Sequence, residues 1–432
     1  MKLSLSLFGA ALSLLFNATA LADDDWLAEA DRRIESHRMA DLEIRVVRDG
    51  KPVPDLKVTV TMRRHEFLFG SNIFKWDRCR TPEENEAYKK RYAELLNFAT
   101  LGFYWWSYEP KPGQPNHAYA RQVADWCAEN GIRTKGHPLA WNYYDPPWAK
   151  NFPADEVYRR QIARVTDCTQ TLQKQVGVWD VVNEAATWDR EKTFKNAPVL
   201  TGLMKEHGPI EMTKACFQAA RQGNPKATLL INDYILDERY DRVIEALRDD
   251  QGKPLYDAIG IQSHMHGGVR ANDSLWKICE RFAKFGVPLH FTEMTILSCD
   301  GPFDEKNPAS PTSEAGERRQ RDDVVRVYTM LFSHPAVAAV TWWDFSDQGA
   351  WMNAPAGLLR ADMSPKPAYE ALRELIHRRW ATNATVTTDQ DGKATLRAFR
   401  GDYAAAIDRT DGTTAEFPFT VMQGKNRMTF EF

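Results

Sequence analysis

The chain has 432 residues, of which 43% are hydrophobic and 27% are charged, and its formal net charge is -3. These values are typical of a globular protein, and a net charge so close to zero argues against the broad basic surface that binds nucleic acid. The length is sufficient for one large catalytic domain and one small domain.

Residues 1–22 have the pattern of a signal peptide. Lys2 supplies the positive charge, residues 3–16 form an apolar stretch, and Ala20-Leu21-Ala22 forms a small-residue cleavage site. The apolar stretch is too short for a spanning helix, and no later segment is apolar enough to span. An uncleaved anchor is the alternative to a cleaved signal peptide. We therefore expect an exported protein, periplasmic or extracellular, with no membrane segment after cleavage.

Residues 23–65 are expected to form an N-terminal helix and a β hairpin. Residues 25–38 are amphipathic, Leu42 to Val47 alternates between apolar and polar side chains, Asp49-Gly50 indicates a turn, and Val58 to Met62 resumes the strand pattern. This element precedes the main repeating pattern of the chain.

Residues 66–379 alternate between short apolar runs and longer amphipathic stretches, and this alternation predicts a (β/α)8 TIM barrel in the α/β class. The expected strands are 67–72, 98–103, 132–140, 177–182, 228–232, 258–262, 287–292 and 337–343. The expected helices are 82–96, 118–130, 154–174, 210–222, 239–249, 274–285, 315–333 and 367–379.

Residues 380–432 differ from the barrel in composition. They are rich in Thr, Val and Phe, and turn signals recur at Asp391-Gly392, Asp411-Gly412 and Gln423-Gly424. The pattern predicts a small accessory β domain of about five strands. We expect it to pack with the N-terminal strands, because both segments flank the barrel in sequence.

The six cysteines do not form a C-x-x-C pair, so a zinc or redox motif is not indicated. Export permits disulfides, but the sequence does not fix a pairing. Buried free thiols and one or two bridges are both compatible with the positions Cys79, Cys127, Cys168, Cys216, Cys279 and Cys299.

Two glutamates follow buried strands on opposite sides of the predicted barrel. Glu184 ends the run that begins at Val178, and Glu293 follows Thr292. The carboxyl ends of barrel strands carry the active site. A glycosidase requires two carboxyl groups that flank the glycosidic bond. One group is protonated and acts as the acid, and the other is ionised. These residues are the predicted catalytic pair.

Other polar and aromatic side chains lie at the same strand ends. His137, Asn183, Gln262 and His264 could bind sugar hydroxyls or a carboxylate, and tryptophans such as Trp343 and Trp351 could stack on sugar rings. A metal site is the competing interpretation, because His137, His264 and His266 could converge with Glu293. No H-E-x-x-H or similar spacing supports it, so we predict neither a metal nor an organic cofactor.

The stretch Trp179-Asp180-Val181-Val182-Asn183-Glu184-Ala185 resembles the acid/base motif of glycoside hydrolase family 10, the retaining endo-β-1,4-xylanase family. Further matches follow in family order over about residues 66–376. They are Phe69-Gly70-Ser71, Gly136-His137-Pro138-Leu139-Ala140-Trp141, Asn232-Asp233-Tyr234, Gly260-Ile261-Gln262-Ser263-His264, Thr292-Glu293, the group Trp343, Asp347 and Trp351, and Pro365-Lys366-Pro367-Ala368-Tyr369.

The resemblance implies a retaining hydrolase that cleaves β-1,4-xylosidic bonds in xylan or xylo-oligosaccharides. Glu184 would be the general acid/base and Glu293 the nucleophile. The residues expected to line the substrate site are His137, Trp141, Asn183, Tyr234, Gln262, His264, Trp343 and Trp351. The expected partner is a polysaccharide or an oligosaccharide.

Four positions depart from the family pattern. Relatives carry an Asn and a Lys after the second strand that grip the second sugar on the non-reducing side, and here these positions are Leu101 and Tyr104. Loss of such donors weakens recognition of a sugar. Asn142 replaces a His, and Thr295 stands where relatives carry an Asp beside the nucleophile, so a negative charge is missing there.

Two alternatives follow from these departures. In the first, the same chemistry acts on a different β-glycoside, such as a decorated oligosaccharide, an aryl glycoside or a saponin glycoside. In the second, the chain is a carbohydrate-binding protein without catalysis on a hydrolase scaffold. The presence of both Glu184 and Glu293 argues against the second alternative.

Overall fold

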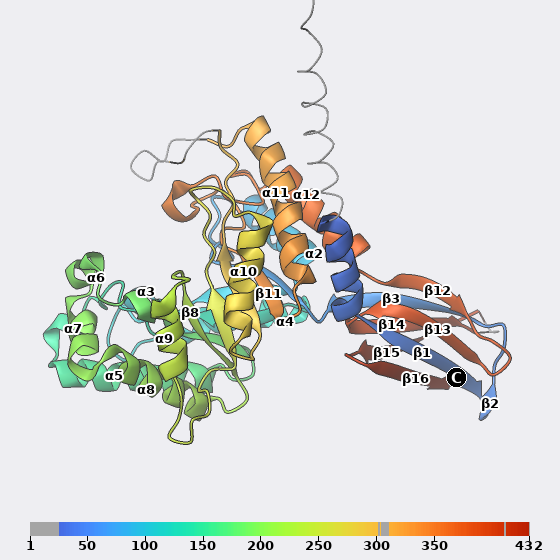
Figure 1. Cartoon of the computed structure of the whole chain (residues 1–432), viewed down its shortest axis with the longest axis horizontal. Coiled ribbons are helices and arrows are strands. Elements are labelled where there is room, and N and C mark those ends of the chain that lie inside the picture. The colour runs from blue at the N-terminus through green and yellow to red at the C-terminus, as the bar shows by residue number, and fades with distance from the viewer. Residues whose placement is uncertain (1–25, 301–302, 304–310, 410–411, 432) are drawn as a thin grey trace, which may run out of the picture. The chain divides into compact units, whose positions relative to one another are not determined.

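The computed structural model describes residues 26–300, 303, 311–409 and 412–431 (Figure 1). The expected signal peptide lies outside the described residues. The chain forms two compact units, and the larger one comprises Arg64–Val327 and Ala336–Trp380. Among the helices that the structure describes, none has the length and apolar character needed to cross a bilayer.

The larger unit is built on eight parallel strands that close into a barrel, because β11 pairs with β4 as well as with β10. The predicted (β/α)8 fold is confirmed, and each strand overlaps an expected run. The strands are β4 (Leu68–Asn72), β5 (Phe98–Gly102), β6 (Arg133–His137), β7 (Val178–Asn183), β8 (Thr228–Asp233), β9 (Ala258–Ile261), β10 (Leu289–Met294) and β11 (Val337–Trp342).

Helices separate the barrel strands as the sequence predicts. The expected helices are α2 (Pro82–Leu95), α4 (His117–Glu129), α5 (Ala154–Thr171), α8 (Pro209–Gly223), α9 (Glu238–Ala246), α10 (Asn272–Ala283), α11 (Glu314–Ser333) and α12 (Pro367–Glu374), which continues as a π-helical turn over Leu375–Arg379. Three further helices were not expected: α3 (Trp105–Tyr108), α6 (Glu191–Asn196) and α7 (Pro198–His207). All three lie in loops that follow the carboxyl ends of strands.

Local sequence explains where these helices begin. Thr81 caps α2 by accepting a hydrogen bond from the Glu84 amide, and Pro82 occupies the first helical position. A proline is favoured there because its missing N–H would have no partner within the helix. Asn116 caps α4 in the same way by accepting from the Tyr119 amide. These caps fix the ends of the segments that lead from the carboxyl ends of β4 and β5 into α2 and α4.

The smaller unit contains two four-stranded sheets to which both ends of the chain contribute. One sheet has the order β13-β1-β16 with β2 on β1, and the other has the order β12-β3-β14-β15. The strands are β1 (Met39–Arg48), β2 (Lys51–Pro52), β3 (Lys57–His65), β12 (Asn383–Thr387), β13 (Lys393–Phe399), β14 (Gly401–Asp408), β15 (Thr414–Val421) and β16 (Lys425–Glu431). The accessory β structure formed by both termini is confirmed.

The N-terminal hairpin differs from the expectation. The turn at Asp49 and Gly50 joins β1 to the two-residue strand β2, and β3 lies in the other sheet. The neighbours of β1 are β13 and β16, which bury Leu42, Ile44 and Val46 in a common core with side chains of β3. The alternating pattern predicted the strands correctly, but it did not determine which strands pair with each other.

All six cysteines are free thiols, and all except the half-buried Cys79 are buried. Burial raises the pKa of Cys127 and Cys216 to about 12. A buried thiol of this kind is protonated and inert at neutral pH. The interpretation as buried free thiols therefore applies to this chain.

Gly136 in β6 tests how tightly the barrel is packed. A Cβ at this position would collide with the indole of Trp179 in the neighbouring strand β7, and that indole is fully buried. We expect Gly136→Ala to lower the free energy of unfolding by about 1–3 kcal/mol, because overpacking forces side chains off their preferred rotamers. Chemical denaturation of the purified protein measures this change.

The matched control is Gly177→Ala. Gly177 is exposed immediately before β7 and has open space where its Cβ would lie. Its substitution should change stability by less than about 0.5 kcal/mol. Equal effects of the two substitutions would contradict the packing argument.

Candidate active site

The two glutamates lie in backbone positions that regular strands do not provide. Glu184 follows β7 with a left-handed φ of 59°, and its amide donates to the carbonyl of Asn232 at 2.8 Å. Glu293 lies in β10 where the register shifts between Phe291 and Met294. Such irregularities redirect side chains next to active sites. Both carboxyl groups are buried at the mouth of the barrel.

A chain of three amide side chains joins the two carboxyl groups. Asn232 Nδ2 donates to Glu293 Oε1 at 2.7 Å and to Asn183 Oδ1 at 2.8 Å. Gln262 Nε2 donates to the same Asn183 Oδ1 at 3.3 Å and to Glu184 Oε1 at 3.1 Å. The amides therefore hold the carboxyls at a fixed separation, and both carboxyls face donors.

The orientation of Asn232 is fixed by its neighbours. Thr292 Oγ1 donates to Asn232 Oδ1 at 2.6 Å, so the amide nitrogen faces Glu293. Gly260 leaves the space that this amide occupies, because a Cβ there would collide with Asn232 Oδ1. Asn232 was quoted from the sequence only as part of a motif, and its role between the carboxyls comes from the structure.

Glu293 is surrounded by histidines. His264 Nε2 lies 3.3 Å from Glu293 Oε2, and His137 Nε2 lies 3.9 Å from Glu293 Oε1. Burial alone would raise the pKa of Glu293, but His137 and His264 outweigh it and the pKa is lowered. His137 Nδ1 is held by Asp180 Oδ2 at 2.8 Å, and Lys135 Nζ lies 2.7 Å from the same oxygen. Glu293 is thus kept ionised at neutral pH.

His264 has a neutral partner on its other nitrogen. Its Nδ1 lies 2.8 Å from Thr295 Oγ1, so the hydroxyl takes the position at which the sequence comparison expected an Asp. His266 stacks on His264 with ring centroids 5.6 Å apart. Burial, with the neighbouring His264, lowers the pKa of His266 to about 4. Trp351, 44% exposed, covers His264 with its ring centroid 4.6 Å away.

Glu184 has different surroundings. Trp141 Nε1 donates to Glu184 Oε2 at 3.2 Å, and Arg190 Nη2 donates to the same oxygen. Arg190 Nη1 also lies 3.4 Å from the hydroxyl of Tyr234, and its guanidinium lies 5.5 Å from the centre of that ring. Sequence reasoning did not identify Arg190, because it lies in a loop without periodicity or a recognised motif.

Asp233 anchors the backbone beside Glu184. Its Oδ2 accepts from the Ala186 amide at 3.0 Å, and its Oδ1 accepts from the amides of Tyr234 and Ile235. Burial raises the pKa of Asp233 to about 7, although these amides lower it. The carboxyl of Asp233 therefore holds the loop that contains Arg190 against the end of β8.

Aromatic side chains form one wall of the site. The ring of Tyr104 meets that of His137 edge-on at 5.6 Å and lies 5.0 Å from that of Trp106. Trp141 stacks on Tyr143 with centroids 4.3 Å apart. Burial, with the charge of Glu293, raises the pKa of Tyr104 well above its usual value. The wall therefore offers the neutral aromatic face of Tyr104 where the family pattern has a Lys.

The structure brings the predicted site residues together at one end of the barrel. His137, Trp141, Asn183, Gln262 and His264 contact a carboxyl or the amide chain. Trp343 meets the rings of His137 and His264 edge-on at 5.4 and 5.9 Å. Tyr234 reaches Glu184 through Arg190, and Trp351 covers His264.

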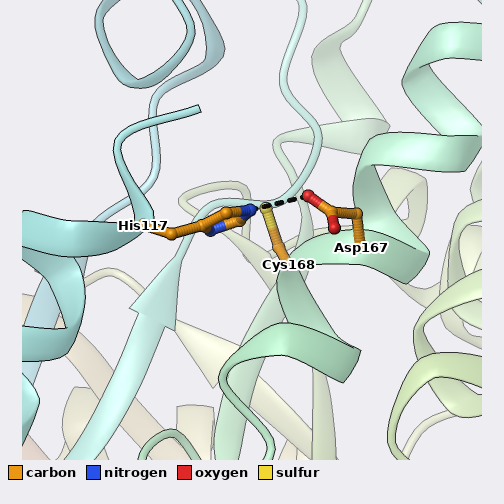
Figure 2. Close-up of side chains that lie close together, drawn as sticks. All are labelled: His117, Asp167 and Cys168. Atoms are coloured by element: carbon orange, nitrogen blue, oxygen red, sulfur yellow. Dashed lines mark hydrogen bonds and ion pairs between the residues drawn. The ribbon is translucent and has the colours of Figure 1, made fainter. Parts of the chain in front are cut away.

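Potential metal ligands gather elsewhere in the part of the chain that the structure describes. One group is His117, Asp167 and Cys168 (Figure 2), and the other is Asp155, Glu206 and His207. In the first group both nitrogens of His117 already have partners, Asp167 Oδ2 at 2.7 Å and Tyr108 Oη at 2.8 Å. Burial raises the pKa of the Cys168 thiol to about 11. A hydrogen-bonded His–Asp pair beside a buried thiol accounts for this group.

The metal site considered from the sequence uses residues other than those in these two groups. His137, His264 and His266 with Glu293 do not form one of the groups found among the described residues. Two of these histidines instead contact the carboxyl of Glu293. Their arrangement supports a role in holding that carboxylate.

His290 lies buried in β10. Burial, with the charge of Lys135, lowers its pKa to about 4, whereas an unfolded histidine titrates near about 6.5. Because the pKa of His290 is lower in the folded than in the unfolded protein, its contribution to stability is complete above the pKa of the unfolded chain. That contribution is lost as the pH falls toward 4. The loss for this group is on the order of 3 kcal/mol.

We therefore expect His290→Gln to lose less stability than the wild type between pH 7 and pH 4.5, because Gln has no charge to bury. Melting temperatures at the two pH values, measured for both proteins, check the difference in slope. Parallel losses in the two proteins would contradict the assignment of a neutral buried imidazole at this position.

A barrel whose mouth holds two buried carboxyls, flanked by histidines and tryptophans, has the site of a glycoside hydrolase. Residues 60–375 match the profile of glycosyl hydrolase family 10, so the chain belongs to this family and is a glycoside hydrolase. The family predicted from the motifs is confirmed.

Relatives with known names agree with this membership. The chain is 29% identical over 276 residues to endo-1,4-beta-xylanase 3 of Hypocrea jecorina, covering 62% of this chain and 71% of that protein. It is 24% identical over 391 residues to anti-sigma-I factor RsgI6 of Acetivibrio thermocellus, covering 88% of this chain but 46% of that longer protein. The match to RsgI6 thus spans less than half of its length.

Solved structures share the fold. Xylanase 10B from Thermotoga petrophila, solved in complex with xylobiose, has a TM-score of 0.60 and 23% identity, covering 73% of this chain and 95% of that chain. The psychrophilic family 10 endo-beta-1,4-xylanase has a TM-score of 0.57 and 23% identity, covering 71% of this chain and 96% of that one. At this identity the likeness establishes the barrel.

Proposed function

We propose that the protein hydrolyses β-1,4-xylosidic bonds in xylan or xylo-oligosaccharides with retention of configuration. The observation that carries this proposal is the amide chain between Glu184 and Glu293, which joins two carboxyls with different surroundings. The names of relatives, such as endo-1,4-beta-xylanase B of Thermotoga neapolitana at 26% identity, support the choice of substrate.

The resemblance to the family motif suggests a role for each carboxyl, and the surroundings of Glu293 support the role of that residue. Glu293, which histidines keep ionised, attacks the anomeric carbon. Glu184, which faces the partly exposed loop of Arg190, donates a proton to the leaving oxygen. Water then attacks the glycosyl-enzyme intermediate after Glu184 has removed its proton. Retention requires the two carboxyls to lie roughly 5–5.5 Å apart, and the amides of Asn183, Asn232 and Gln262 bridge the two groups.

The remaining predicted residues have supporting roles in this proposal. Asn183, Gln262 and His137 offer hydrogen bonds to the hydroxyls of the sugar that is cleaved, since they already face the carboxyls. Trp343 and the exposed Trp351 offer apolar faces to sugar rings. We also propose that the enzyme is exported, on the pattern of residues 1–22.

Substitution of the two glutamates tests the roles. Glu293→Ala should abolish turnover, because no nucleophile remains. Glu184→Ala should lower the rate on xylan by about 10²–10⁴-fold but should affect an aryl glycoside with a good leaving group much less, because that group leaves without a proton. Azide should rescue Glu184→Ala and give a β-azide product.

The control for these substitutions is Glu238→Ala, which removes an exposed carboxylate from the first turn of α9. It should retain wild-type rates. Glycan binding with the same absence of turnover in wild type and Glu293→Ala would instead support the alternative of a carbohydrate-binding protein. Inverted product would overturn the retaining mechanism.

A second candidate substrate has its own structural support. A cavity of about 240 Å³ adjoins the aromatic wall, and its lining includes Phe74, Leu101, Tyr104 and Tyr119. Phe74 and Tyr104 also face the catalytic site through Trp343 and His137. This largely aromatic space, which Arg78 and Asn116 also line, favours a β-glycoside with a bulky substituent, such as a decorated oligosaccharide or an aryl or saponin glycoside.

The double variant Leu101→Asn, Tyr104→Lys restores the polar pair of the family and tests this candidate. We expect its kcat/KM to rise on unsubstituted xylo-oligosaccharides relative to aryl and decorated substrates, because two hydrogen-bonding groups replace apolar surface. Phe194→Lys, which adds the same charge at an exposed position on α6, is the control. An unchanged ratio of rates would reject a role for this wall in specificity.

A further inference from the structure

Glu184 has an unusual set of partners for a proton donor. Trp141 and Arg190 donate to Oε2, and Gln262 donates to Oε1. All three partners are N–H groups, and one carries a full positive charge. Donors of this kind stabilise a carboxylate and oppose its protonation. In the free enzyme, N–H donors therefore occupy both carboxyl oxygens of Glu184.

Arg190 differs from the other two donors in how it is held. Trp141 is stacked on Tyr143, and Gln262 is buried with a second bond to Asn183. The side chain of Arg190 is 28% exposed, whereas that of Glu184 is 8% exposed. It enters the site from the loop between Glu184 and α6, so solvent and ligands reach it from outside.

Tyr234 provides a second contact for the same guanidinium. Arg190 Nη1 lies 3.4 Å from the tyrosine hydroxyl, and the guanidinium carbon lies 5.5 Å from the ring centre. A cation over an aromatic ring is attracted to it without a carboxylate. The guanidinium can therefore leave Glu184 and keep a favourable contact nearby.

We propose that Arg190 is a displaceable positioning residue, which the departing sugar moves off Glu184 and which returns to it once that sugar has left. The inference rests on the proposed retaining mechanism. With substrate bound, Arg190 moves toward Tyr234 and Oε2 takes up a proton from solvent. Glu184 gives this proton to the glycosidic oxygen as the bond from that oxygen to C1 breaks and C1 bonds to Glu293.

The return of Arg190 favours the second half of the reaction. Glu184 is then a carboxylate next to a positive charge and an indole N–H, with its remaining lone pairs available to water. It takes a proton from the water whose oxygen bonds to C1, while the bond from C1 to Glu293 breaks. Arg190 thus favours the protonated form of Glu184 when it moves away and the carboxylate form when it returns.

The test is the pH profile of Arg190→Met. We expect the high-pH limb of kcat/KM on a xylo-oligosaccharide to move upward by about one pH unit, since a positive charge within contact distance favours the carboxylate by that order. On an aryl xyloside with a good leaving group, where water attack limits turnover, the low-pH limb of kcat should also move upward, because Glu184 must be ionised to accept a proton from water. Arg190→Lys should restore the wild-type position of the limb in part, because it keeps the charge.

The control is Arg239→Met, which removes an exposed arginine that pairs with Asp237 at the start of α9. It should leave both the limb and kcat unchanged. A uniform loss of rate in Arg190→Met, with the limb in its wild-type position, would show a structural role only and would overturn the proposal. Melting temperatures of the variants establish that they are folded.

The same measurements separate this inference from the proposed function. A wild-type enzyme without turnover on xylo-oligosaccharides and aryl xylosides would overturn the proposed function. A wild-type enzyme with turnover, together with an unmoved limb in Arg190→Met, would overturn the role of Arg190 alone.

Discussion

The site depends on holding two buried carboxyls close together in surroundings that differ between the two groups. Two carboxylates in one apolar mouth would repel each other and raise each other's pKa. The amides of Asn183, Asn232 and Gln262 stand between them and donate hydrogen bonds to both. Histidines then favour the charged form of Glu293. The two groups therefore differ in their remaining partners, which are imidazoles at Glu293 and an indole and a guanidinium at Glu184.

The barrel makes this arrangement possible at a few glycines and at a few positions where the strand backbone is irregular. Gly260 leaves room for the amide of Asn232, and Gly136 leaves room for the indole of Trp179. The left-handed φ of Glu184 and the register shift beside Glu293 turn both carboxyls toward the mouth. Replacing regular strand geometry at these few points costs stability. The eight closed strands, whose hydrogen bonds are satisfied all round, supply the rigidity that tolerates this cost.

Much of the fold and the catalytic pair could be predicted because they follow from local rules. Apolar runs gave eight strands within a few residues of their bounds, and an acid that follows a buried strand has few structural explanations, as with Glu184. Partner choice was not local: β1 and β3 were expected to pair, yet they lie in different sheets. Arg190 could not be predicted, because a loop arginine acquires its partner through the path of the backbone, here held by Asp233.

The pairing of β1 with β16 joins segments from opposite ends of the chain, with Asp41 opposite Lys425 in a parallel register. Contacts at such sequence separation form late, because closing a long loop is entropically costly. The sheet around β1 therefore cannot be completed before β16 is available. Until then one edge of β1 has no partner strand, although the barrel sequence that lies between the two strands can already fold.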